Sequence, residues 1–222
     1  MQHQIIENSS DSSNRMQRVL EYRDGLKRWT DIIGVLVLAP FAVPLVSILW
    51  ILARLGGGSG FFGHLRVGQD GRQFRCWKIR TMVPDAQTRL TAHLMMNPAA
   101  AREWAATYKL KNDPRITGFG RFLRKTSLDE LPQLWNVFIG QMSLVGPRPV
   151  PEKELLEYVG YEWAYLMMRP GITGVWQVSG RNDISYRERV SMDVGYLLKV
   201  SLKTDMRILW KTIWVVLQKT GV

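Results

Sequence analysis

Residues 32–53 read IIGVLVLAPFAVPLVSILWILA, an unbroken run of 22 uncharged and mostly aliphatic residues. About 20 such residues are enough for a helix to cross the hydrocarbon core of a membrane. The run is too long for a cleavable signal peptide, and no small-residue cleavage motif follows it. This stretch therefore predicts a membrane-embedded helix in the N-terminal part of the chain.

Two prolines, Pro40 and Pro44, lie in the middle of this run. Each lacks a backbone N–H and clashes with the preceding turn, so we expect a sharp kink. Basic residues flank the run on both sides: Arg15, Arg18, Arg23, Lys27 and Arg28 before it, and Arg54, Arg66, Arg72 and Arg75 after it. Because basic flanks favour the cytoplasmic side, the pattern favours a re-entrant helix with both ends on that side. A true span stays open as the alternative.

The rest of the chain predicts a helical domain with a small β-hairpin. The glycine-rich residues 56–60 separate the membrane segment from it. The hairpin is predicted between Phe61 and Met82, with its turn at Asp70-Gly71, since these residues tolerate positive φ. Helices are predicted over 85–96, from Asn97 to about Leu110, from Ser185 to Tyr196 and from Ser201 to Lys219. The predicted fold class is therefore α+β and mostly helical.

We divide the chain into three parts: a polar tail and juxtamembrane helix (1–28), the re-entrant membrane helix (29–54) and a cytosolic domain (55–222). The last predicted helix has apolar residues near helical spacing: Leu202, Met206, Leu209, Ile213, Trp214 and Leu217. Such a helix packs on a core or lies at a membrane interface, and both interpretations stay open.

Composition limits the kind of partner. The chain carries 30 Lys and Arg against 19 Asp and Glu, a formal charge of +11, which indicates an anionic partner such as nucleic acid, acidic lipid or a phosphorylated substrate. Its single cysteine, Cys76, and three scattered histidines make a zinc site improbable and fit a reducing compartment. Any metal should be a hard ion held by carboxylates and phosphates.

An adjacent acid pair, Asp129-Glu130, lies in the stretch RFLRKTSLDELPQLWN at 121–136. The apolar residues after the pair follow one face of a helix whose start can be drawn in two ways. Ser127 and Glu130 form a capping-box pattern, but Asp129 as the cap puts Pro132 third, where its missing donor is an orphan anyway. We favour Asp129. Either start places both carboxylates at the positive end of the helix dipole.

On local grounds the acid pair serves as a helix cap or as a reactive site. Arg121, Arg124 and Lys125 lie just upstream, and we expect them to converge with the helix N-terminus on phosphate oxygens. Gly146-Pro147-Arg148-Pro149 is a stiff loop that presents Arg148 at little entropic cost. Acids within such a site suggest a divalent metal, an activated carboxylate or both. The residues alone thus predict phosphoryl transfer at a membrane surface.

Long motifs extend this prediction: RVGQDGRQFRCWKIRTM at 66–82, DPRITGFGRFLRKTSLDELPQLWNVFIGQMSLVGPRP at 113–149, RPGITGVWQVSGRND at 169–183 and the segment Asp193 to Tyr196. From Lys27 to about Leu217 the chain resembles the bacterial sugar transferases, the monotopic polyprenyl-phosphate phosphoglycosyl transferases. Within the family, its motifs look most like those of the exopolysaccharide-type galactose- or glucose-1-phosphate transferases. The resemblance implies a broken re-entrant membrane helix, in agreement with the two prolines. The predicted fold class is therefore α+β with a re-entrant helix, a small β-hairpin and interfacial amphipathic helices.

The resemblance implies an enzyme of the bacterial inner membrane, on its cytoplasmic face. It implies that Asp129 attacks the sugar-bearing phosphate of a UDP-hexose, releasing UMP, and that undecaprenyl phosphate then takes the sugar-phosphate. This would be the first membrane step of exopolysaccharide repeat-unit assembly. Glu130 would bind Mg²⁺. The other family positions are two phosphate contacts and two residues at the nucleotide end: Arg124, Arg148, Arg181 and Asp193.

Two positions depart from the family pattern: Val43 before Pro44, where many members have Ser, and Gln141, where members usually carry an acid. Ser47 is a candidate to replace the missing hydroxyl. Two other functions were weighed, a membrane-tethered nucleic-acid binder and a non-catalytic scaffold. We predict no nucleic-acid partner, because the basic residues cluster around carboxylates. Membrane lipid is an expected partner, and a homodimer and the identity of the sugar stay open.

Overall fold

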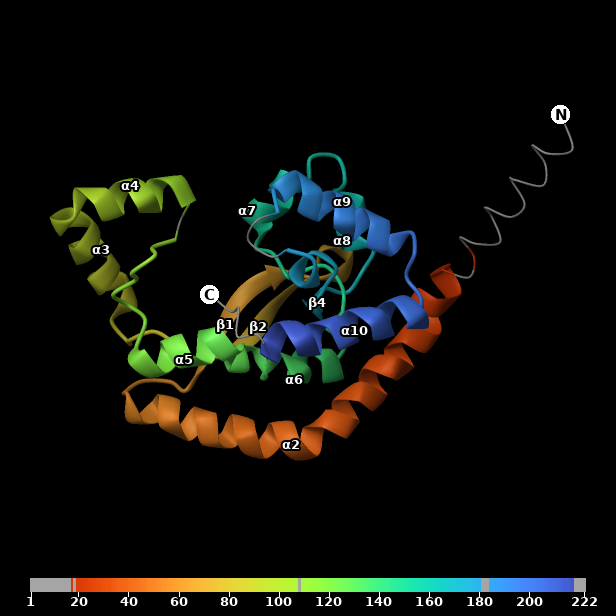
Figure 1. Ribbon diagram of the computed structural model, residues 1–222, viewed down its shortest axis with the longest axis horizontal. Coiled ribbons are helices and arrows are strands. Elements are labelled where there is room, and N and C mark those ends of the chain that lie inside the picture. The colour runs from red at the N-terminus through yellow and green to blue at the C-terminus, as the bar shows by residue number, and fades with distance from the viewer. Residues whose placement is uncertain (1–16, 18, 108, 181–183, 218–222) are drawn as a thin grey trace, which may run out of the picture.

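Helices make up most of the structure, as Figure 1 shows. The computed structural model describes residue 17 and residues 19–107, 109–180 and 184–217. In chain order the elements are the π-helix η1 (Tyr22–Leu26), α2 (Lys27–Leu55), β1 (Phe61–Val67), η2 (Gln69–Gly71), β2 (Gln73–Ile79), α3 (Ala86–Met96), α4 (Pro98–Thr107), α5 (Gly118–Thr126), η3 (Leu128–Glu130), α6 (Gln133–Phe138), β3 (Ser143–Val145), α7 (Glu152–Leu155), η4 (Leu156–Tyr158), α8 (Glu162–Leu166), β4 (Gly171–Thr173), η5 (Trp176–Val178), α9 (Tyr186–Leu197) and α10 (Leu202–Leu217). The predicted α+β class is confirmed.

Helix α2 carries the apolar run and stays helical through both of its prolines. It bends in its middle, as the prolines predict (Figure 1). The hydroxyl of Ser47 donates to the carbonyl of Val43 at 2.9 Å, so Ser47 supplies a hydroxyl to the helix backbone next to Pro44. Such bonding to the residue four positions back also favours bending. Within the described residues, the helix Val19–Leu55 is the one long and apolar enough to cross a membrane.

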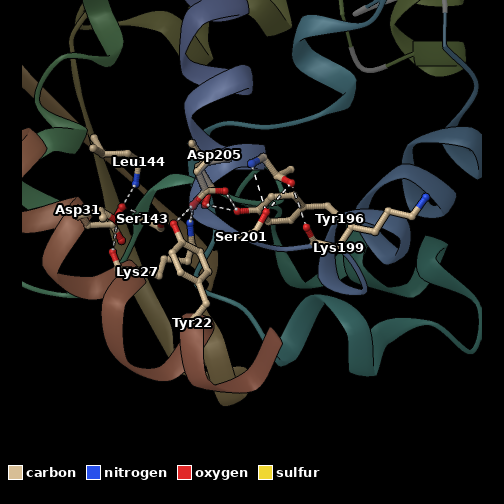
Figure 2. A network of polar contacts seen from close by, with 12 residues as sticks. Tyr22, Lys27, Asp31, Ser143, Leu144, Tyr196, Lys199, Ser201 and Asp205 are labelled. Atoms are coloured by element: carbon tan, nitrogen blue, oxygen red, sulfur yellow. Dashed lines mark hydrogen bonds and ion pairs between the residues drawn. The ribbon is translucent and has the colours of Figure 1, made fainter. Parts of the chain in front are cut away.

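The N-terminal end of α2 is fixed to the globular part by a buried polar network (Figure 2). The Lys27 ammonium lies 2.6 Å from Asp205 of α10. The hydroxyls of Tyr22 and Tyr196 donate to the same carboxylate at 2.8 and 2.6 Å. One turn later, the carboxylate of Asp31 accepts from the hydroxyl of Ser143 and from the backbone N–H that follows, at 3.0 and 2.9 Å.

The C-terminal end of α2 packs against the same globular part at a different place. Leu49 and Ala53 are buried in one cluster with Ile79 of β2 and Leu123 of α5. The guanidinium of Arg80 donates to the carbonyl of Ala53 at 2.7 Å and so satisfies one of the free carbonyls at the helix end. Both ends of the bent helix therefore contact one body, while apolar side chains between them, such as Val37 and Phe41, are exposed.

The predicted hairpin is confirmed. Strands β1 and β2 pair antiparallel from Phe61↔Ile79 to Val67↔Gln73. In the turn, Asp70 and Gly71 have φ of 56° and 76°, the left-handed conformation that this residue pair tolerates. A second, parallel pair joins β3 to β4, and the sequence analysis did not predict it. Helices α7, α8 and α9 gather on one side of the hairpin, and α5, α6 and α10 lie on the other, toward α2 (Figure 1).

The predicted helices at 85–96 and from Asn97 correspond to α3 and α4, and the Asn97 side chain caps α4 by accepting from the N–H groups of Ala99 and Ala100 at 3.1 Å. The pair projects from the body (Figure 1). The chain leaves and returns side by side, because Met82 bridges Ile116 and the N–H of Val83 donates to the carbonyl of Arg115. The α3–α4 excursion is thus closed at its base.

Helix α10 lies where it was predicted, but its apolar residues mostly face outward. Asp205 and Ile208 face the interior. Most of the predicted apolar face is exposed, together with Trp210: Leu202 42%, Met206 51%, Trp210 64%, Ile213 53%, Trp214 57% and Leu217 67%. Polar contacts hold the inner face, including the hydroxyls of Thr173 and Thr212 at 2.8 Å. The arrangement favours the interfacial interpretation of this helix, which requires an apolar exposed face.

Candidate active site

Asp129 and Glu130 lie in the short 3-10 turn η3 between α5 and α6. Both predicted helix starts are therefore wrong, since α6 begins only at Gln133 and neither Ser127 nor Asp129 makes a capping bond. The reason is Ser127, which takes the left-handed conformation at φ 57° and ends α5. The chain then needs a tight turn before it can form another helix. Pro132 directly precedes α6, where its missing N–H costs no helical bond.

Strand β2 is fixed beside this turn by the fully buried side chain of Asn136. Its amide oxygen accepts from the N–H of Trp77 at 3.0 Å, and its amide nitrogen donates to the carbonyl of Arg75 at 2.8 Å. The same nitrogen donates to the Gln141 side chain at 2.7 Å. The uncharged Gln141 therefore orients the Asn136 amide, which in turn fixes strand β2. Because Lys78 follows Trp77, this brace also places Lys78 at the acid pair.

Among the residues that the structure describes, two cations contact the Glu130 carboxylate. The Lys78 ammonium lies 2.6 Å from Glu130 Oε1 and 4.0 Å from Asp129 Oδ2. The Arg148 guanidinium lies 3.5 Å from the same Glu130 oxygen. The sequence analysis predicted Arg148 in this site but missed Lys78.

Arg124 approaches the site from α5. Its Nε donates to the hydroxyl of Thr81 at 3.0 Å, and its charge acts on Asp129. The close approach of α5 to the end of β2 depends on Gly120, because a Cβ there would lie 2.0 Å from the carbonyl oxygen of Thr81. Arg121 and Lys125, on the same helix, are exposed. The predicted convergence of all the upstream cations is therefore wrong: α5 turns Arg124 inward and leaves the other two in solvent.

The loop that carries Arg148 is held by the parallel strand pair. The N–H of Gly146 donates to the carbonyl of Thr173 at 2.9 Å, and the N–H of Gly171 donates to the carbonyl of Pro147 at 2.8 Å. A Cβ on Gly171 would lie 2.1 Å from the backbone of Gly146, so only glycine permits this contact. The predicted stiff loop is thus fixed by backbone bonds as well as by its prolines.

The two acids differ in their ionisation. Burial raises the pKa of Asp129, and the positive charges of Lys78 and Arg124 act against that rise. Burial also favours the protonated form of Glu130, but Lys78 and Arg148 outweigh it and lower its pKa to about 2. Glu130 is therefore ionised throughout the physiological range, while the ionisation of Asp129 depends on its neighbouring cations.

Of the two predicted nucleotide-binding residues, the structure describes Asp193, which is not among the contacts of the acid pair. Asp193 lies inside α9, 1% exposed, and accepts a 2.8 Å hydrogen bond from Tyr158. Burial raises its pKa to about 7. Arg181 lies outside the described residues. Both nucleotide assignments stay predictions.

Lys78 had a signal in the sequence. Residues two apart on a strand share a face, and Lys78 continues the row of Phe74 and Cys76, which are 5% and 2% exposed. A lysine at the end of an inward-facing row needs an anionic partner. The motif CWKIRTM contained this alternation, but the partner could not be identified without the tertiary structure.

Comparison with known proteins identifies the family of the chain. The family model described as bacterial sugar transferase matches residues 22–219. The chain is 53% identical over 88% of its length to a UDP-galactose-lipid carrier transferase of Erwinia amylovora, and it covers 41% of that relative. It is 49% identical over 93% of its length to an undecaprenyl-phosphate galactose phosphotransferase of Salmonella typhimurium, covering 44% of it. The chain thus spans less than half the length of these two relatives.

A third relative is similar in length. The exopolysaccharide production protein ExoY of Rhizobium meliloti is 48% identical over 84% of this chain, and the match covers 83% of that protein. The family match includes the bent apolar helix, the hairpin with Lys78, the acid pair and the Arg148 loop. The chain belongs to the bacterial sugar transferase family.

Proposed function

We propose that this protein transfers a hexose-1-phosphate from a UDP-hexose to undecaprenyl phosphate, as the first membrane step of exopolysaccharide assembly. The observation that carries the proposal is the buried Asp129 beside Glu130, Lys78 and Arg124. A buried carboxylate among cations is suited to attack a phosphate, because the cations attract the anionic substrate and favour the ionised nucleophile. The relatives named for undecaprenyl phosphate and for exopolysaccharide production support the same substrates.

In the first step, a carboxylate oxygen of Asp129 attacks the phosphorus that carries the sugar. The bond between this phosphorus and the bridging oxygen breaks, and UMP leaves with the electron pair. The sugar-phosphate stays on Asp129 as an acyl phosphate. In the second step, an oxygen of undecaprenyl phosphate attacks the same phosphorus, which frees Asp129 and forms a lipid-linked diphosphate sugar. Arg124 and Arg148 orient the phosphates through charge-assisted hydrogen bonds.

Glu130 fits the role of a magnesium ligand. Mg²⁺ is commonly held by one or two carboxylates together with substrate phosphates and water. The described residues offer the adjacent acids Asp129 and Glu130 and no cluster of three or more His, Cys, Asp or Glu side chains. Glu130 would hold the ion, and a bound Mg²⁺ would offset the negative charge that develops on the phosphates during transfer. Arg181 and Asp193 keep their proposed place at the nucleotide end.

The proposed location is the cytoplasmic face of the bacterial inner membrane. Both ends of α2 contact one globular body, and the exposed apolar residues lie between them. A straight span would carry one end about 30 Å away from that body. This geometry supports a re-entrant helix that enters and leaves on one face.

The hexose is proposed to be galactose or glucose. The two relatives that match at 53% and 49% identity are named for galactose, and an Escherichia coli relative with 33% identity is named for glucose. The higher identity of the first two favours galactose.

The test is release of UMP by detergent-solubilised protein incubated with UDP-galactose or UDP-glucose, Mg²⁺ and undecaprenyl phosphate. We expect release of UMP with one of these donors. When the sugar of the donor carries a tritium label and the lipid acceptor is left out, we expect the label to stay bound to the protein. Asp129→Asn should abolish both signals, and Asp85→Asn, an exposed acid on the α3–α4 excursion, should keep them. Full activity in Asp129→Asn would rule out the proposed nucleophile.

A further inference from the structure

The protein itself fixes the Lys78 ammonium at the acid pair. Its ammonium makes a 2.6 Å contact with Glu130 Oε1, and its side chain is only 24% exposed. The residues before and after Lys78 are both fixed. The N–H of Trp77 donates to the Asn136 side chain, and Ile79 is buried in the cluster at the C-terminal end of α2. The ammonium is therefore a built-in counter-ion of the acid pair.

A counter-ion at this place conflicts with a metal ion. A divalent cation bound to Glu130 would lie within a few ångströms of the Lys78 ammonium, and the two positive charges would repel each other strongly in a partly buried site. Arg148 also contacts the same oxygen, but at 3.5 Å and with 40% of its side chain exposed, so it can move away more easily. Lys78 and the metal thus compete for one carboxylate.

We propose that Lys78 occupies the place of the divalent cation in the ligand-free protein and must leave Glu130 when the metal binds. This inference rests on the proposed metal role of Glu130. Once displaced, the ammonium is free to contact the phosphate oxygens of the incoming substrate. Without substrate the site therefore binds metal weakly, and the acid pair is neutralised by a group that the protein supplies itself.

The first test measures Mn²⁺ binding without nucleotide, using Mn²⁺ as a paramagnetic substitute for Mg²⁺ followed by electron paramagnetic resonance. Lys78→Met removes the competing charge, and we expect Mn²⁺ to bind about tenfold more tightly. The matched control is Arg75→Gln, which removes a charge from an exposed position on the same strand and should leave the affinity unchanged. Equal or weaker Mn²⁺ binding in Lys78→Met would overturn the proposal.

The second test needs no variant. Reductive methylation of the wild-type protein, read by mass spectrometry, reports how accessible each lysine is. Mn²⁺ should increase the labelling of Lys78 and leave that of the exposed Lys125 unchanged, because only Lys78 loses its carboxylate partner. Unchanged or lower labelling of Lys78 at saturating Mn²⁺ contradicts displacement.

Glu130→Gln separates this inference from the proposed metal site. If Glu130→Gln loses Mn²⁺ binding while Lys78→Met gains none, the metal role of Glu130 stands and the competition fails. If Glu130→Gln binds Mn²⁺ like the wild type, the metal role itself is wrong, and the competition falls with it.

Discussion

Asp129 and Glu130 are neighbours in the chain, yet their surroundings shift their pKa values in opposite directions. Burial raises the pKa of Asp129, whereas for Glu130 the charges and hydrogen bonds of Lys78 and Arg148 together outweigh burial and lower the pKa. Two adjacent carboxylates with separated pKa values suit two roles, one as nucleophile and one as a permanently charged ligand. Repulsion between the acids adds to the difference, because the ionised Glu130 raises the pKa of Asp129 further.

This separation predicts the acid side of the pH profile. An acid with a raised pKa loses its ionised form as the pH falls through that raised value, so activity should decline at a higher pH than for an ordinary aspartate. Arg124 lowers the pKa of Asp129, so Arg124→Gln should move the decline to still higher pH. The measurement is single-turnover UMP release across the pH range. Arg121→Gln, exposed on the same helix, should leave the profile in place, and an unmoved profile in Arg124→Gln would contradict the prediction.

The raised pKa of Asp193 predicts that the stability of the folded protein depends on pH. Its pKa is about 7 in the folded protein against an ordinary 3.8. The folded state therefore holds a proton that the unfolded state loses, and the stability present below about pH 4 is lost as the pH rises toward 7. The difference corresponds to about 4 kcal/mol. Asp193→Asn, which can still accept from Tyr158, should melt at a higher temperature than the wild type at pH 8 but not at pH 4. Equal melting temperatures of the wild type and Asp193→Asn at pH 8 would contradict this prediction.

At the residue level the sequence singled out the adjacent acids Asp129 and Glu130 but did not predict their environment. Asp129, Glu130, Arg124 and Arg148 could be named from their motifs. For Lys78 the signal was only the alternation along its strand, because its partner Glu130 lies 52 residues away. The left-handed Ser127, which moves the helix start, also has no strong local signal, since serine rarely adopts that conformation.

At the level of elements, α2 and α10 are joined by one buried ion pair. Lys27 and Asp205 lie 2.6 Å apart with side chains 10% and 7% exposed. Removing one member of such a pair leaves a buried charge without a partner and typically costs about 3–5 kcal/mol. We expect Lys27→Met to lower the melting temperature strongly. The double variant Lys27→Met with Asp205→Asn should recover part of the loss. Additive effects in this double-mutant cycle would argue against a direct coupling.

The bend in α2 predicts the topology of its ends. Cysteines placed at Glu21 and Ser59, both exposed, should react with a membrane-impermeant reagent from the same side of sealed vesicles. The native Cys76 is 2% exposed and should stay unlabelled. Replacing Pro40 and Pro44 by Ala should straighten the helix and reduce same-side labelling. Labelling of the two cysteines from opposite sides would establish a span.

Element predictions succeeded where the signal was local. The proline pair predicted the bend, Asp-Gly predicted the hairpin turn, and Asn97 predicted the start of α4. The inner face of α10 was not predictable, because Asp205 and Thr212 face inward only to meet Lys27 and Thr173, which come from distant segments. The parallel pair of β3 and β4 was missed for the same reason, since each strand has only three residues.

At the scale of the whole molecule, one side gathers exposed apolar and aromatic groups. They come from α2, α6 and α10, including the stacked pair Trp135 and Phe138 with ring centroids 5.8 Å apart. These elements share the side of the hairpin along which α2 runs (Figure 1). Because large exposed apolar surfaces mark membrane or partner contacts, this side is expected to face the lipid.

This orientation predicts which tryptophans contact lipid. In liposomes with brominated acyl chains, the wild-type fluorescence should be quenched, and replacing Trp210 or Trp214 with Phe should remove part of that quenching. Trp163 of α8 is 48% exposed but lies with the helices on the other side of the hairpin. Its replacement by Phe should leave the quenched fraction unchanged. The reverse pattern would mean that α10 faces water.

The closed base of the α3–α4 excursion also has an evolutionary consequence. The strand carrying Lys78 and the helix carrying Arg124 are held together by contacts at residues 81–83 and 115–120. Within the described residues, the ion pairs of Asp129 and Glu130 involve no residue of the chain between these contacts. The length of the α3–α4 excursion can therefore vary among related proteins, and another domain could be inserted there. Gly120 should not vary in this way, because any side chain there would push α5 away from the end of β2.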